Sequence, residues 1–506
     1  MDIVFEKGIK HTAHGLNFYM SYFDDIARLL PRDELCFVVG GWVRDRLLGE
    51  PVGYKIDVDL LVTCDPRKIA KDLAEAIGGT YFEFEKKGLL RRPTVATVIL
   101  EIPPYRYRFD FSQIKGKDIE KALVEDLLSR DFTANAMAVS LDDVLSIGAK
   151  QTIIYDPAHG VEDLEMGVLR PVSIKNLEED PVRILRGVRL SVEKDLELTE
   201  DFYQFVLRKK HIIRKASPER ITVELLRILE LPNSARALRE MYRLGLLQEL
   251  FPDIARWKEV TTSHYSLEKH MDLLWEEMDK VVEEKEKFLH AELLSQIGSK
   301  KFLGEFSDLA ALKLAAIFHD IAKPHTFQMK DGKPTFYQHD QLGALLVKEY
   351  GKAYRWGEDL TRFVADLVTY HLRVFYLKES LKKGELTDRG RGKFWKECGH
   401  IAPWLFLHSI ADARASHDSE EELHHLMDTI HDLTHFAMRS KTKPIKPLLT
   451  GHDIMELLSI PPGPLVGEIK RALEEAQLEG KVSTREEAID FVKNYLRNSN
   501  LMGEPS

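Results

Sequence analysis

The feature that most constrains the fold is the stretch 55–62, which reads KIDVDLLV. Its apolar residues, from Ile56 to Leu60, recur at every second position, which is typical of a half-buried β-strand. Asp57 and Asp59 occupy the alternate positions, although Asp is depleted in strands and neighbouring carboxylates on one face repel each other. Such a strand needs an apolar core against one face and a partner for two negative charges on the other.

Composition places the chain among globular proteins of several domains. It has 506 residues, 44% hydrophobic and 30% charged, so we expect three or four domains. No apolar run approaches the roughly 20 residues that cross a bilayer, and no signal peptide is recognisable, so we expect a cytoplasmic protein without a membrane partner. Three widely spaced cysteines without a CxxC pair fit reduced, buried thiols. The net charge of −10 argues against indiscriminate coating of nucleic acid but allows a local basic surface.

The order of the expected elements divides the chain into a mixed first part and a helical remainder. Short strands are expected at 35–39, 55–62, 94–102 and 105–111, with an amphipathic helix at 66–77. After about residue 175 the strand patterns fade and a helical period dominates. We therefore predict an α+β fold, with a small mixed sheet and helices over about the first 145 residues, followed by helical domains.

Two glycines precede the acidic strand, between an expected strand and an expected helix. Gly40 and Gly41 would let backbone N–H groups approach a phosphate at the positive end of that helix, with Arg44 in its first turn. Beside such a turn, Asp57 and Asp59 suit Mg²⁺ that bridges the protein and a triphosphate. The alternative is that the two acids face water on an edge strand.

Asp110, in the segment RYRFDFSQI, is a candidate third carboxylate. It shares a strand face with Arg106 and Arg108. A neighbouring strand that placed it beside the acidic pair would complete a three-acid metal site. The alternative, a salt bridge to one of the two arginines, is equally compatible with the sequence.

Five ordered motifs follow one another between about residues 35 and 235. They are GGWVRDRLLG (40–49) with DVD (57–59), LLSRDFTANAMAV (127–139), YDPAHGVEDLEMGVLRPV (155–172), EEDPVRILRGVR (178–189) and SPERITVELLRIL (217–229). Together they closely resemble the class II tRNA nucleotidyltransferase and bacterial poly(A) polymerase family. The resemblance implies a polymerase-β-like nucleotidyltransferase head and a helical neck, with tRNA, ATP and CTP as partners.

The resemblance also implies site residues. It assigns the triphosphate and Mg²⁺ to Gly40, Gly41, Asp57 and Asp59. Arg130 and Asp131 match a ribose-contacting RD motif, and Asp180 and Arg183 match a motif that pairs with the edge of the incoming base. The family usually has RRD, and Ser129 at the first position here weakens one predicted contact.

The chemistry of the last motif supports base selection by protein groups. Asp180 and Pro181 predict a helix start, with Asp as N-cap and Pro at the first helical position. Arg183, Arg186 and Arg189 then recur every three residues as a basic stripe. A carboxylate acceptor and a guanidinium donor could match the edge of adenine or of cytosine. The alternative is a cap followed by a solvated basic face.

A second group of candidate ligands lies in the helical part. An apolar helix ends in the adjacent His319 and Asp320. The other members are His270 upstream and His339, His371 and Asp412 downstream. Imidazole with carboxylate suits Zn, Mn, Ni or Fe, and such a centre can activate water against a phosphodiester. A single buried histidine is more often a satisfied core residue.

This pattern resembles the HD phosphohydrolase superfamily over about residues 260–415. The resemblance implies a metal core of His270, His319, Asp320 and Asp412. His339 and His371 would be additional ligands or phosphate-binding groups. The implied activity is hydrolysis of 2′,3′-cyclic or terminal phosphates.

Basic stretches and the C-terminal part suggest an RNA surface. Residues 207–220 and 439–446 are rich in Lys and Arg, which phosphate contacts need, although a solvated helix face is the usual explanation. The segment 448–489, with PGP and EAQLEGKVSTREEA, resembles the family's tail and would bind the elbow of a tRNA.

The leading prediction is a template-independent enzyme that adds C and A to the tRNA 3′ end from CTP and ATP. Close alternatives are a poly(A) polymerase and CC-only or A-only enzymes, which the family distinguishes by a loop, here residues 82–97. A signalling uridylyltransferase and a non-catalytic RNA-binding scaffold represent other classes. The predicted domains are 1–145 (nucleotidyltransferase head), 146–235 (helical neck), 236–440 (HD-type domain) and 441–506 (helical tRNA-binding tail).

Overall fold

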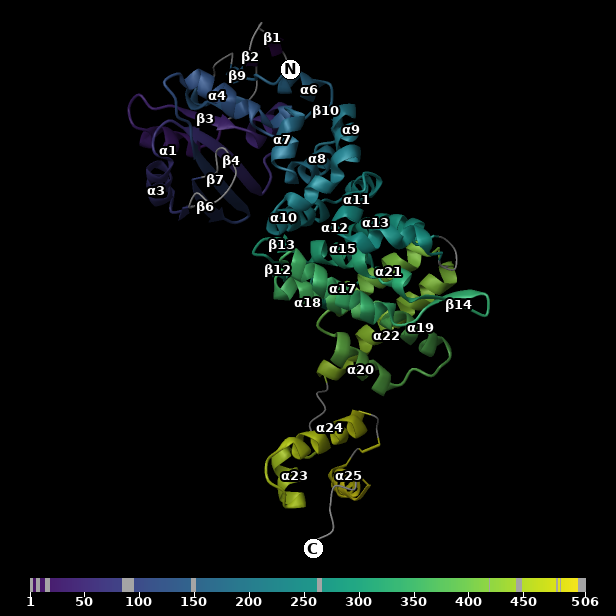
Figure 1. The fold of residues 1–506 in the computed structure, drawn as a ribbon. Helices are drawn as coiled ribbons and strands as arrows, with labels where there is room; N and C mark the ends of the chain where they lie inside the picture. Colours follow the sequence, from purple (N-terminus) through teal and green to yellow (C-terminus); the bar gives the residue numbers. More distant parts are fainter. Residues whose placement is uncertain are drawn as a thin grey trace. The chain divides into compact units, whose positions relative to one another are not determined.

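The structure is a computed structural model that describes most of the chain. The described residues are 3–5, 10–13, 19–83, 95–146, 152–261, 266–417, 419–442, 448–478, 481–482 and 484–498. The chain folds as two compact units, shown in Figure 1. The first comprises Met1–Ile228 and Arg236–Leu250, and the second Leu229–Ala235 and Phe251–Ser506. Among the helices that the structure describes, none is both long enough and apolar enough to span a bilayer.

The first unit is built on a mixed sheet, as the sequence predicts. Across the described part of the chain the strand order is β1-β2-β9-β8-β3-β4-β7-β6-β5. Strands β4 and β7 pair in parallel, and the other neighbours are antiparallel. The strands are β1 (Ile3–Phe5), β2 (Lys10–Ala13), β3 (Cys36–Val39), β4 (Lys55–Val62), β5 (Thr80–Glu83), β6 (Ala96–Ile102), β7 (Tyr105–Gln113), β8 (Ala138–Ser140) and β9 (Thr152–Tyr155).

Strand β4 lies inside this sheet, between β3 and β7. Ile56, Val58 and Leu60 are buried, whereas Asp57 and Asp59 between them are exposed. The alternation predicted from the sequence is therefore confirmed. The edge-strand alternative is wrong, because a strand paired on both sides has no open edge to protect.

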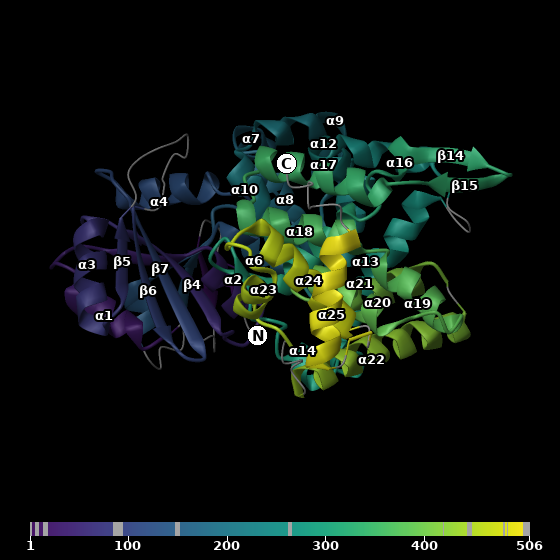
Figure 2. The same ribbon diagram turned by 90° about the horizontal axis from the view of Figure 1, so that it is seen from below.

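Helices cover the two faces of the sheet differently. Helices α1 (Tyr22–Leu29) and α3 (Pro66–Ile77) pack against each other, and α3 contacts β5, β6 and β7. Helix α4 (Ile119–Leu128) packs in a cluster with Leu61 of β4. Figure 2 shows the sheet with α1 and α3 on one side and α4 on the other. Because alternate residues share a face, Asp59 projects on the same side as Leu61, beyond the apolar cluster that α4 forms.

The rest of the first unit is mainly helical. At the start of α6, a Cβ on Gly160 would lie 2.2 Å from the carbonyl oxygen of Thr133, so only glycine lets α6 pack this closely against η1. The remaining elements are α2 (Gly41–Leu47), η1 (Thr133–Asn135), α5 (Leu141–Leu145), α6 (Gly160–Glu165), β10 (Val168–Leu169), α7 (Ile174–Glu179), α8 (Val182–Glu193), β11 (Glu197–Leu198), α9 (Glu200–Lys209), η2 (Lys210–Lys215), α10 (Pro218–Leu229), α11 (Ser234–Arg243) and α12 (Leu246–Leu250).

The second unit is a helical assembly around the apolar helix α15, which is buried along its length. Helices α13, α18 and α21 pack against it. The elements are η3 (Pro252–Glu259), α13 (Leu267–Glu283), η4 (Lys285–Lys287), α14 (Ala291–Leu294), β12 (Lys301–Phe302), β13 (Phe306–Ser307), α15 (Asp308–Phe318), α16 (Lys323–Thr326), β14 (Phe327–Lys330), β15 (Lys333–Phe336), α17 (His339–Ala353), α18 (Glu358–Tyr370), α19 (Arg373–Lys382), α20 (Asp388–Cys398), α21 (Ala402–Ala415) and α22 (Glu420–Thr442).

Three helices at the C-terminal end form a small core of their own. They are α23 (Gly451–Leu458), α24 (Pro464–Leu478) and α25 (Arg485–Asn498). Their buried side chains include Ile454 and Ile469. A capping box begins α23, in which Thr450 and Asp453 satisfy each other's backbone N–H groups.

Local expectations compare well with the observed elements. Strand β4 and helix α3 have the predicted bounds, and α+β is the observed class. The short ribbons β10–β11, β12–β13 and β14–β15 were not predicted, because strands of two to four residues show no period. Cys36 and Cys398 are buried as expected, but Cys64 is only half-buried, and all three are free thiols. Residues 84–94, most of the loop expected to distinguish the activities, lie outside the described residues.

Candidate functional site

Three carboxylates come together in the first unit because β4 and β7 run parallel. The register places Asp59 directly opposite Asp110, and Asp57 opposite Arg108. Asp110 accepts a hydrogen bond from the Thr97 hydroxyl and another from Arg108 Nε at 3.1 Å. Both expectations for Asp110 are therefore met at once, since it lies beside the acidic pair and also forms a salt bridge to Arg108.

The environment of Asp59 disfavours its negative charge. Although the side chain remains accessible to water, the protein around it removes enough solvation to raise its pKa to about 6. The carboxylates of Asp110 and Asp57 contribute to the rise, and Arg130 and Arg186 oppose it. A cation bound between the carboxylates would remove this penalty.

The glycine turn lies against the acidic strand. Gly40 has φ of +73°, and a Cβ there would lie 2.8 Å from Arg130 Nη1 and 3.1 Å from Asp59 Oδ2. Only glycine therefore fits between the guanidinium and the carboxylate. The turn immediately precedes α2, as expected for a backbone that approaches a phosphate.

Arg44 lies in the wall of the site and connects two segments. Its side chain is buried and donates to Asp45 Oδ1 at 2.7 Å and to Asn135 Oδ1 at 2.6 Å. These contacts fasten α2 to the segment that carries the RD motif. The sequence predicts a nucleotide contact for Arg44, and its observed partners are protein groups.

The RD motif is held by a network of charged groups. Arg130 donates to Asp126 Oδ2 at 3.2 Å, and Asp131 accepts from Arg186 Nη1 at 3.0 Å and from Asn135 Nδ2 at 3.1 Å. Burial alone would raise the pKa of Asp131, but the nearby arginines and Asn135 lower it to about 2. Asp131 is therefore ionised at neutral pH.

The base-edge motif differs from its expected local structure. Helix α8 begins at Val182, and Asp180 is not its N-cap. The Asp180 carboxylate instead forms a bidentate pair with Arg220 of α10. Arg220 Nη1 donates to Oδ1 at 2.8 Å and Nη2 donates to Oδ2 at 2.7 Å. Arg183 lies 3.4 Å from the same carboxylate and donates to the backbone oxygen of Ser129 at 3.0 Å. The long-range bidentate pair replaces the predicted local cap.

The basic stripe on α8 is neutralised in part by Glu224 of α10. Arg186 and Arg189 both contact this carboxylate, at 3.4 and 3.0 Å, and Arg227 contacts it at 3.3 Å. The alternative of a solvated basic face is therefore wrong for these two residues of the stripe. The side chains enclose a hollow of about 180 Å³ lined by Val182, Arg186, Glu219, Arg220, Val223, Glu224 and Arg227.

The sequence analysis missed Glu224 and the role of Arg220 in orienting Asp180. Their spacing of four residues in SPERITVELL places both on one face of α10, which was an available clue. Elsewhere in the predicted basic stretch 207–220, Arg214 forms an ion pair with Glu249. Of the second stretch, residues 443–446 lie outside the described residues.

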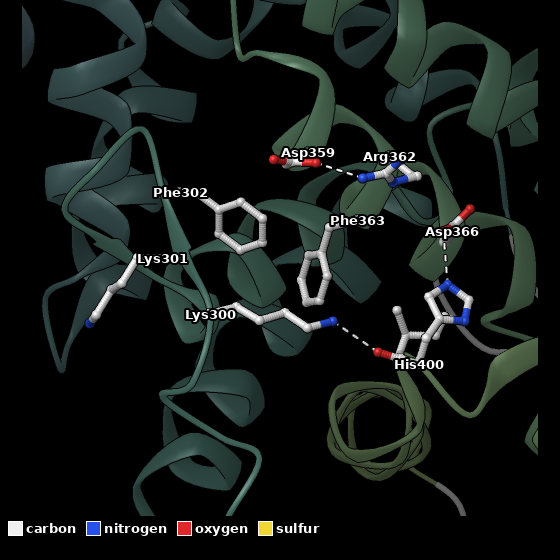
Figure 3. Close-up of a pocket in the computed structure, with 9 residues that line it drawn as sticks. Lys300, Lys301, Phe302, Asp359, Arg362, Phe363, Asp366 and His400 are labelled. Carbon is white, nitrogen blue, oxygen red and sulfur yellow. Dashed lines mark hydrogen bonds and ion pairs between the residues drawn. The ribbon is translucent and has the colours of Figure 1, made fainter.

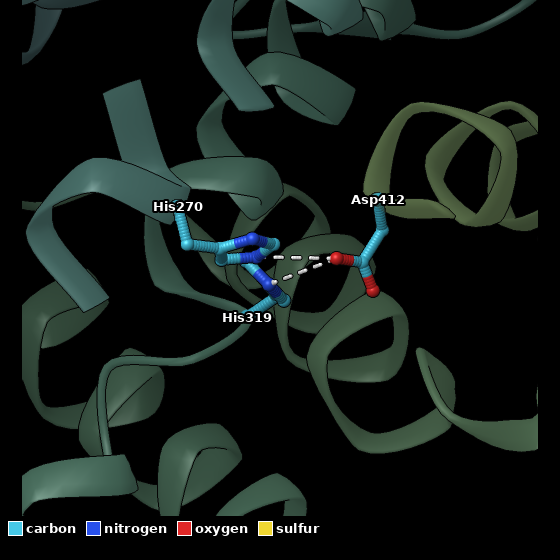
Figure 4. Close-up of side chains that lie close together, drawn as sticks. All are labelled: His270, His319 and Asp412. Atoms are coloured by element: carbon cyan, nitrogen blue, oxygen red, sulfur yellow. Dashed lines mark ion pairs between the residues drawn. The ribbon is translucent and has the colours of Figure 1, made fainter. Parts of the chain in front are cut away.

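In the second unit, all six predicted metal ligands converge. His270 comes from α13, His339 begins α17 and Asp412 lies on α21. His319 and Asp320 directly follow α15, and His371 directly follows α18. Figure 4 shows His270, His319 and Asp412 pointing toward one another from three segments. The simpler alternative of separate, satisfied core histidines is wrong, because residues up to 142 positions apart share one centre.

The distances within this centre are those of ligands around cations. His270 Nε2 lies 3.2 Å from Asp412 Oδ1, and His319 Nε2 lies 3.1 Å from Asp320 Oδ2. Among the described residues, His270 Nε2, His319 Nε2 and Asp320 Oδ1 have no hydrogen-bond partner although they are buried. Buried polar atoms without partners are costly, so the residues present fit a bound metal.

The electrostatics of the centre favour ionised carboxylates and a neutral His371, and they shift His319 the opposite way, toward its protonated form. Burial alone would raise the pKa values of Asp320 and Asp412, but the facing imidazoles hold both well below their usual range. Burial and the neighbouring His319 and His339 lower the pKa of His371 well below its usual value. Asp320 counteracts burial at His319 and raises the pKa of that imidazole. Ionised carboxylates and a neutral imidazole are the forms that coordinate metals.

His408 is a further member of this centre that the sequence analysis missed. It is buried one helical turn before Asp412, with its ring centroid 5.0 Å from that of His319 and 6.2 Å from that of His371. In the described structure neither ring nitrogen has a hydrogen-bond partner, and burial lowers its pKa to about 3. The i, i+4 spacing of His408 and Asp412 was the available clue.

A separate hollow of about 320 Å³ in the second unit contains none of the predicted site residues. Figure 3 shows its lining, where Lys300 Nζ donates to the His400 carbonyl oxygen at 2.9 Å and His400 pairs with Asp366. Arg362 likewise pairs with Asp359. Both carboxylates of the lining are therefore paired, Asp359 with Arg362 and Asp366 with His400.

Comparison with known families identifies four segments. The model for the poly(A) polymerase head domain matches residues 36–170, and the model described as a probable RNA- and SrmB-binding site of polymerase A matches 195–258. The HD domain model matches 287–392, and domain 2 of the tRNA nucleotidyltransferases matches 411–492. The first match contains the acidic strand and the RD motif. The third contains four of the six candidate metal ligands.

Whole-chain relatives agree with these matches. The chain is 30% identical over 470 residues to a CC-adding tRNA nucleotidyltransferase of Thermus thermophilus, covering 91% of this chain and 93% of the relative. It is 29% identical over 468 residues to an A-adding tRNA nucleotidyltransferase of Deinococcus radiodurans, covering 90% and 95%. A solved CCA-adding enzyme in an apo form shares the fold, with a TM-score of 0.58, 20% identity and 96% and 94% coverage. The chain therefore belongs to the tRNA nucleotidyltransferase family and is an enzyme.

Proposed function

We propose that this enzyme adds C and A to the 3′ end of tRNA, taking CMP and AMP from CTP and ATP. The observation that carries the proposal is the arrangement of Asp57, Asp59 and Asp110 on two parallel strands beside the Gly40 turn. The names of the relatives support tRNA as the acceptor. The new bond forms between the 3′ oxygen and the α-phosphorus, and the bond from that phosphorus to pyrophosphate breaks.

The donor set suits Mg²⁺, which prefers carboxylate oxygens. When bound, Mg²⁺ would neutralise the triphosphate and favour the attacking hydroxyl and the leaving pyrophosphate. Asp57 and Asp59 would hold the ion, with Asp110 as the third carboxylate. The Gly40–Gly41 backbone would face the phosphates, and Arg130 with Asp131 would position the ribose.

For base selection, we assign Asp180 and Arg183 to the edge of the incoming base, within the predicted neck at 146–235. The bidentate grip of Arg220 orients the Asp180 carboxylate, which still has lone pairs to accept from a base amino group. Arg186 and Arg189, which pair with Glu224, would keep α8 and α10 in register. The basic segment 207–220 and the C-terminal helices α23–α25 are our proposed tRNA contacts.

The activity assay uses purified protein with Mg²⁺ and two tRNA transcripts, one lacking CCA and one ending in CC. We expect CTP alone to extend the first transcript by two residues and ATP to extend the second by one. Replacing Asp57 or Asp59 by Ala should lower the rate at least about a thousandfold, because the metal supplies several kcal/mol of transition-state stabilisation. If the enzyme incorporated neither CMP nor AMP, the proposal would be overturned.

The same assay separates the narrower activities. A CC-only enzyme would extend the transcript that lacks CCA but not the transcript that ends in CC. An A-only enzyme would extend only the transcript that ends in CC. These are the second candidates, since the two whole-chain relatives described above carry those names. A long A tail would instead identify a poly(A) polymerase.

The raised pKa of Asp59 predicts a pH-dependent effect on stability. Its folded-state pKa of about 6 exceeds the value of about 3.9 expected in the unfolded chain, so the folded protein binds this proton more tightly. The resulting contribution to the free energy of unfolding is fully present below about pH 4. That contribution disappears as the pH rises through about 6. Without metal, Asp59→Asn should therefore melt a few degrees above the parent protein at pH 8 and equal to it at pH 4, measured by thermal unfolding.

Metal provides the control for this measurement. Added Mg²⁺ should raise the melting temperature of the parent protein at pH 8 and leave that of Asp59→Asn nearly unchanged. An Asn variant that melts below the parent protein at pH 8 without metal would contradict the assigned charge penalty.

Arg220 provides a test of base selection. Arg220→Ala should loosen the Asp180 carboxylate and lower the ratio of kcat/KM for CTP over UTP about tenfold, the value of one lost charged hydrogen bond. Arg227→Ala is the matched control, because Arg227 is similarly exposed but pairs with Glu224 rather than with Asp180. If Arg220→Ala and Arg227→Ala had the same ratio of kcat/KM for CTP over UTP, the Arg220–Asp180 pair would not determine base specificity.

A second candidate function is phosphohydrolysis at the HD-type centre of the second unit. Its support is the convergence of six candidate ligands, together with three buried atoms that lack a hydrogen-bond partner within the described residues, His270 Nε2, His319 Nε2 and Asp320 Oδ1. The mixture of imidazole and carboxylate favours a transition metal such as Ni, Mn, Zn or Fe. Such a metal, when bound, activates water toward a phosphate ester. The proposed substrates are RNA ends that carry 2′,3′-cyclic or terminal phosphates.

His319 provides the test of this second activity. His319→Ala should lower metal-dependent hydrolysis of 2′,3′-cyclic AMP at least about a hundredfold, because a ligand is lost. Nucleotidyl transfer should be unchanged, since its proposed residues belong to the other compact unit. His400→Ala is the matched control, because this exposed histidine forms only a surface ion pair with Asp366. An unchanged hydrolysis rate in His319→Ala would reject the assignment.

A further inference from the structure

A buried cation lies at the C-terminal end of α8, outside the residues assigned to the reaction. Lys194 is the C-cap residue of this helix, and its side chain is only 7% exposed. Its Nζ donates to Glu50 Oε2 at 2.7 Å and lies 3.1 Å from Asp45 Oδ1. Glu193 Oε1 lies 3.4 Å from the same nitrogen. Lysines this buried occur almost only where they are paired, and here two of the partners come from α2 and the turn that follows it.

The end of α2 is folded so that both of its carboxylates reach this lysine. Gly49 has φ of +70°, and the chain reverses there. The N–H of Glu50 donates to the carbonyl oxygen of Asp45 at 3.0 Å, and the N–H of Gly49 donates to that of Arg46 at 3.1 Å. This hydrogen-bond pattern is a Schellman motif, and it brings Asp45 and Glu50 together although they are separated along the chain. The Lys194 cation is favoured further by the negative end of the α8 dipole.

A second connection between α2 and α8 runs through the RD motif. Arg44 of α2 donates to Asn135 Oδ1 at 2.6 Å, and Asn135 Nδ2 donates to Asp131 Oδ1 at 3.1 Å. The other oxygen of Asp131 accepts from Arg186 Nη1 of α8 at 3.0 Å. Arg44 also donates to Asp45 Oδ1 at 2.7 Å. The adjacent residues Arg44 and Asp45 therefore join both connections into one network of charged groups.

The two connections hold α2 at two separate points of α8. Residues 186 and 194 lie roughly 12 Å apart along the helix axis. A single point would allow α2 to pivot, whereas two points at this separation fix the angle between the helices. The Gly40–Gly41 turn begins α2, and Asp180 and Arg183 lie at the start of α8. A nucleotide that reaches both must therefore match a fixed separation between the two helix starts.

We infer that Lys194 is a positioning residue, which fixes the turn that faces the triphosphate relative to the motif that selects the base. This inference rests on the proposed nucleotide site and deepens it, because it adds a determinant of base selection that does not touch the nucleotide. The competing explanation is that Lys194 only stabilises the fold. Its loss would then lower the amount of active enzyme and leave base selection unchanged.

The test compares Lys194→Met with the parent protein on the two tRNA transcripts used in the activity assay. Methionine keeps most of the length of the side chain and removes its charge. We expect kcat for the correct nucleotide to fall about tenfold while KM stays within about twofold, because misplacement costs rate more than binding. The ratio of kcat/KM for CTP over UTP, or for ATP over GTP on the transcript ending in CC, should also fall about tenfold.

Three further variants separate the role of the charge from that of the helix end. Lys194→Arg keeps the charge and should restore at least half of the parent ratio. Glu50→Ala removes the nearest partner on the α2 side and should lower the same ratio at least about threefold, with little further loss in the double variant. Arg236→Met is the matched control, because Arg236 pairs with Asp195 at the same helix end but is exposed, and it should keep the parent ratio.

Hydrogen exchange measures the connection without any substrate. In Lys194→Met the amides of α2 should exchange at least about tenfold faster than in the parent protein, and those of α3 at the parent rate. Because loss of a buried cation leaves carboxylates unpaired, the melting curve of each variant is recorded. A folded Lys194→Met with the parent ratio, or with parent exchange in α2, would overturn the inference. If Lys194→Met does not fold, Glu50→Ala decides by the same two measurements.

The outcomes also separate this inference from the proposed function. A parent protein that incorporates CMP or AMP, together with an unchanged ratio in Lys194→Met, would reject the role of Lys194 and keep the proposed function. A parent protein that incorporates neither would reject the proposed function, and the exchange of α2 would then decide whether Lys194 holds this helix.

Discussion

The parallel pairing of β4 with β7 is the constraint on which the first unit depends. It places Asp59 opposite Asp110 in a sheet whose other neighbouring strands run antiparallel. Buried residues on the alternate positions, such as Val58 and Phe109, anchor both strands. The backbone therefore holds the carboxylates close together, and a bound cation would relieve the repulsion that Arg108 and Arg130 leave uncompensated. A loop with the same residues would move apart and lose the site.

The second unit reaches a comparable arrangement with helix ends. Four of its candidate ligands follow or begin helices, and His270 and Asp412 lie in the first turn of α13 and the last turn of α21, so side chains from helix ends point into a shared centre. His319 follows the most apolar helix of the unit, and the burial of that helix fixes its end. The cost is a set of buried polar atoms that find no protein hydrogen-bond partner within the described parts of the chain. Such a cost is retained where a ligand compensates for it.

The sequence predicted the features that depend on local pattern. The bounds of β4 and α3 follow from periodicity and capping, and the convergence of His270 with Asp412 follows from motif order and family resemblance. What it could not predict are choices between partners distant in the chain. Asp180 suits a helix cap locally, but Arg220, forty residues away, offers two charged donors, which outweigh one backbone N–H. His408 likewise could not be assigned to the centre from the sequence, because it lies beside His319 and His371 only through the packing of the helices.

Each site is complete within one compact unit, and the two sites use different donor chemistry. Carboxylates dominate in the first unit, which suits a hard ion that also binds phosphate oxygens. Imidazoles dominate in the second, which suits transition metals that lower the pKa of bound water. The difference in ligand type would favour a different ion at each of the two proposed sites. Under the proposed functions, the composition of each site would assign formation of a phosphodiester bond to the first unit and hydrolysis of a phosphate ester to the second.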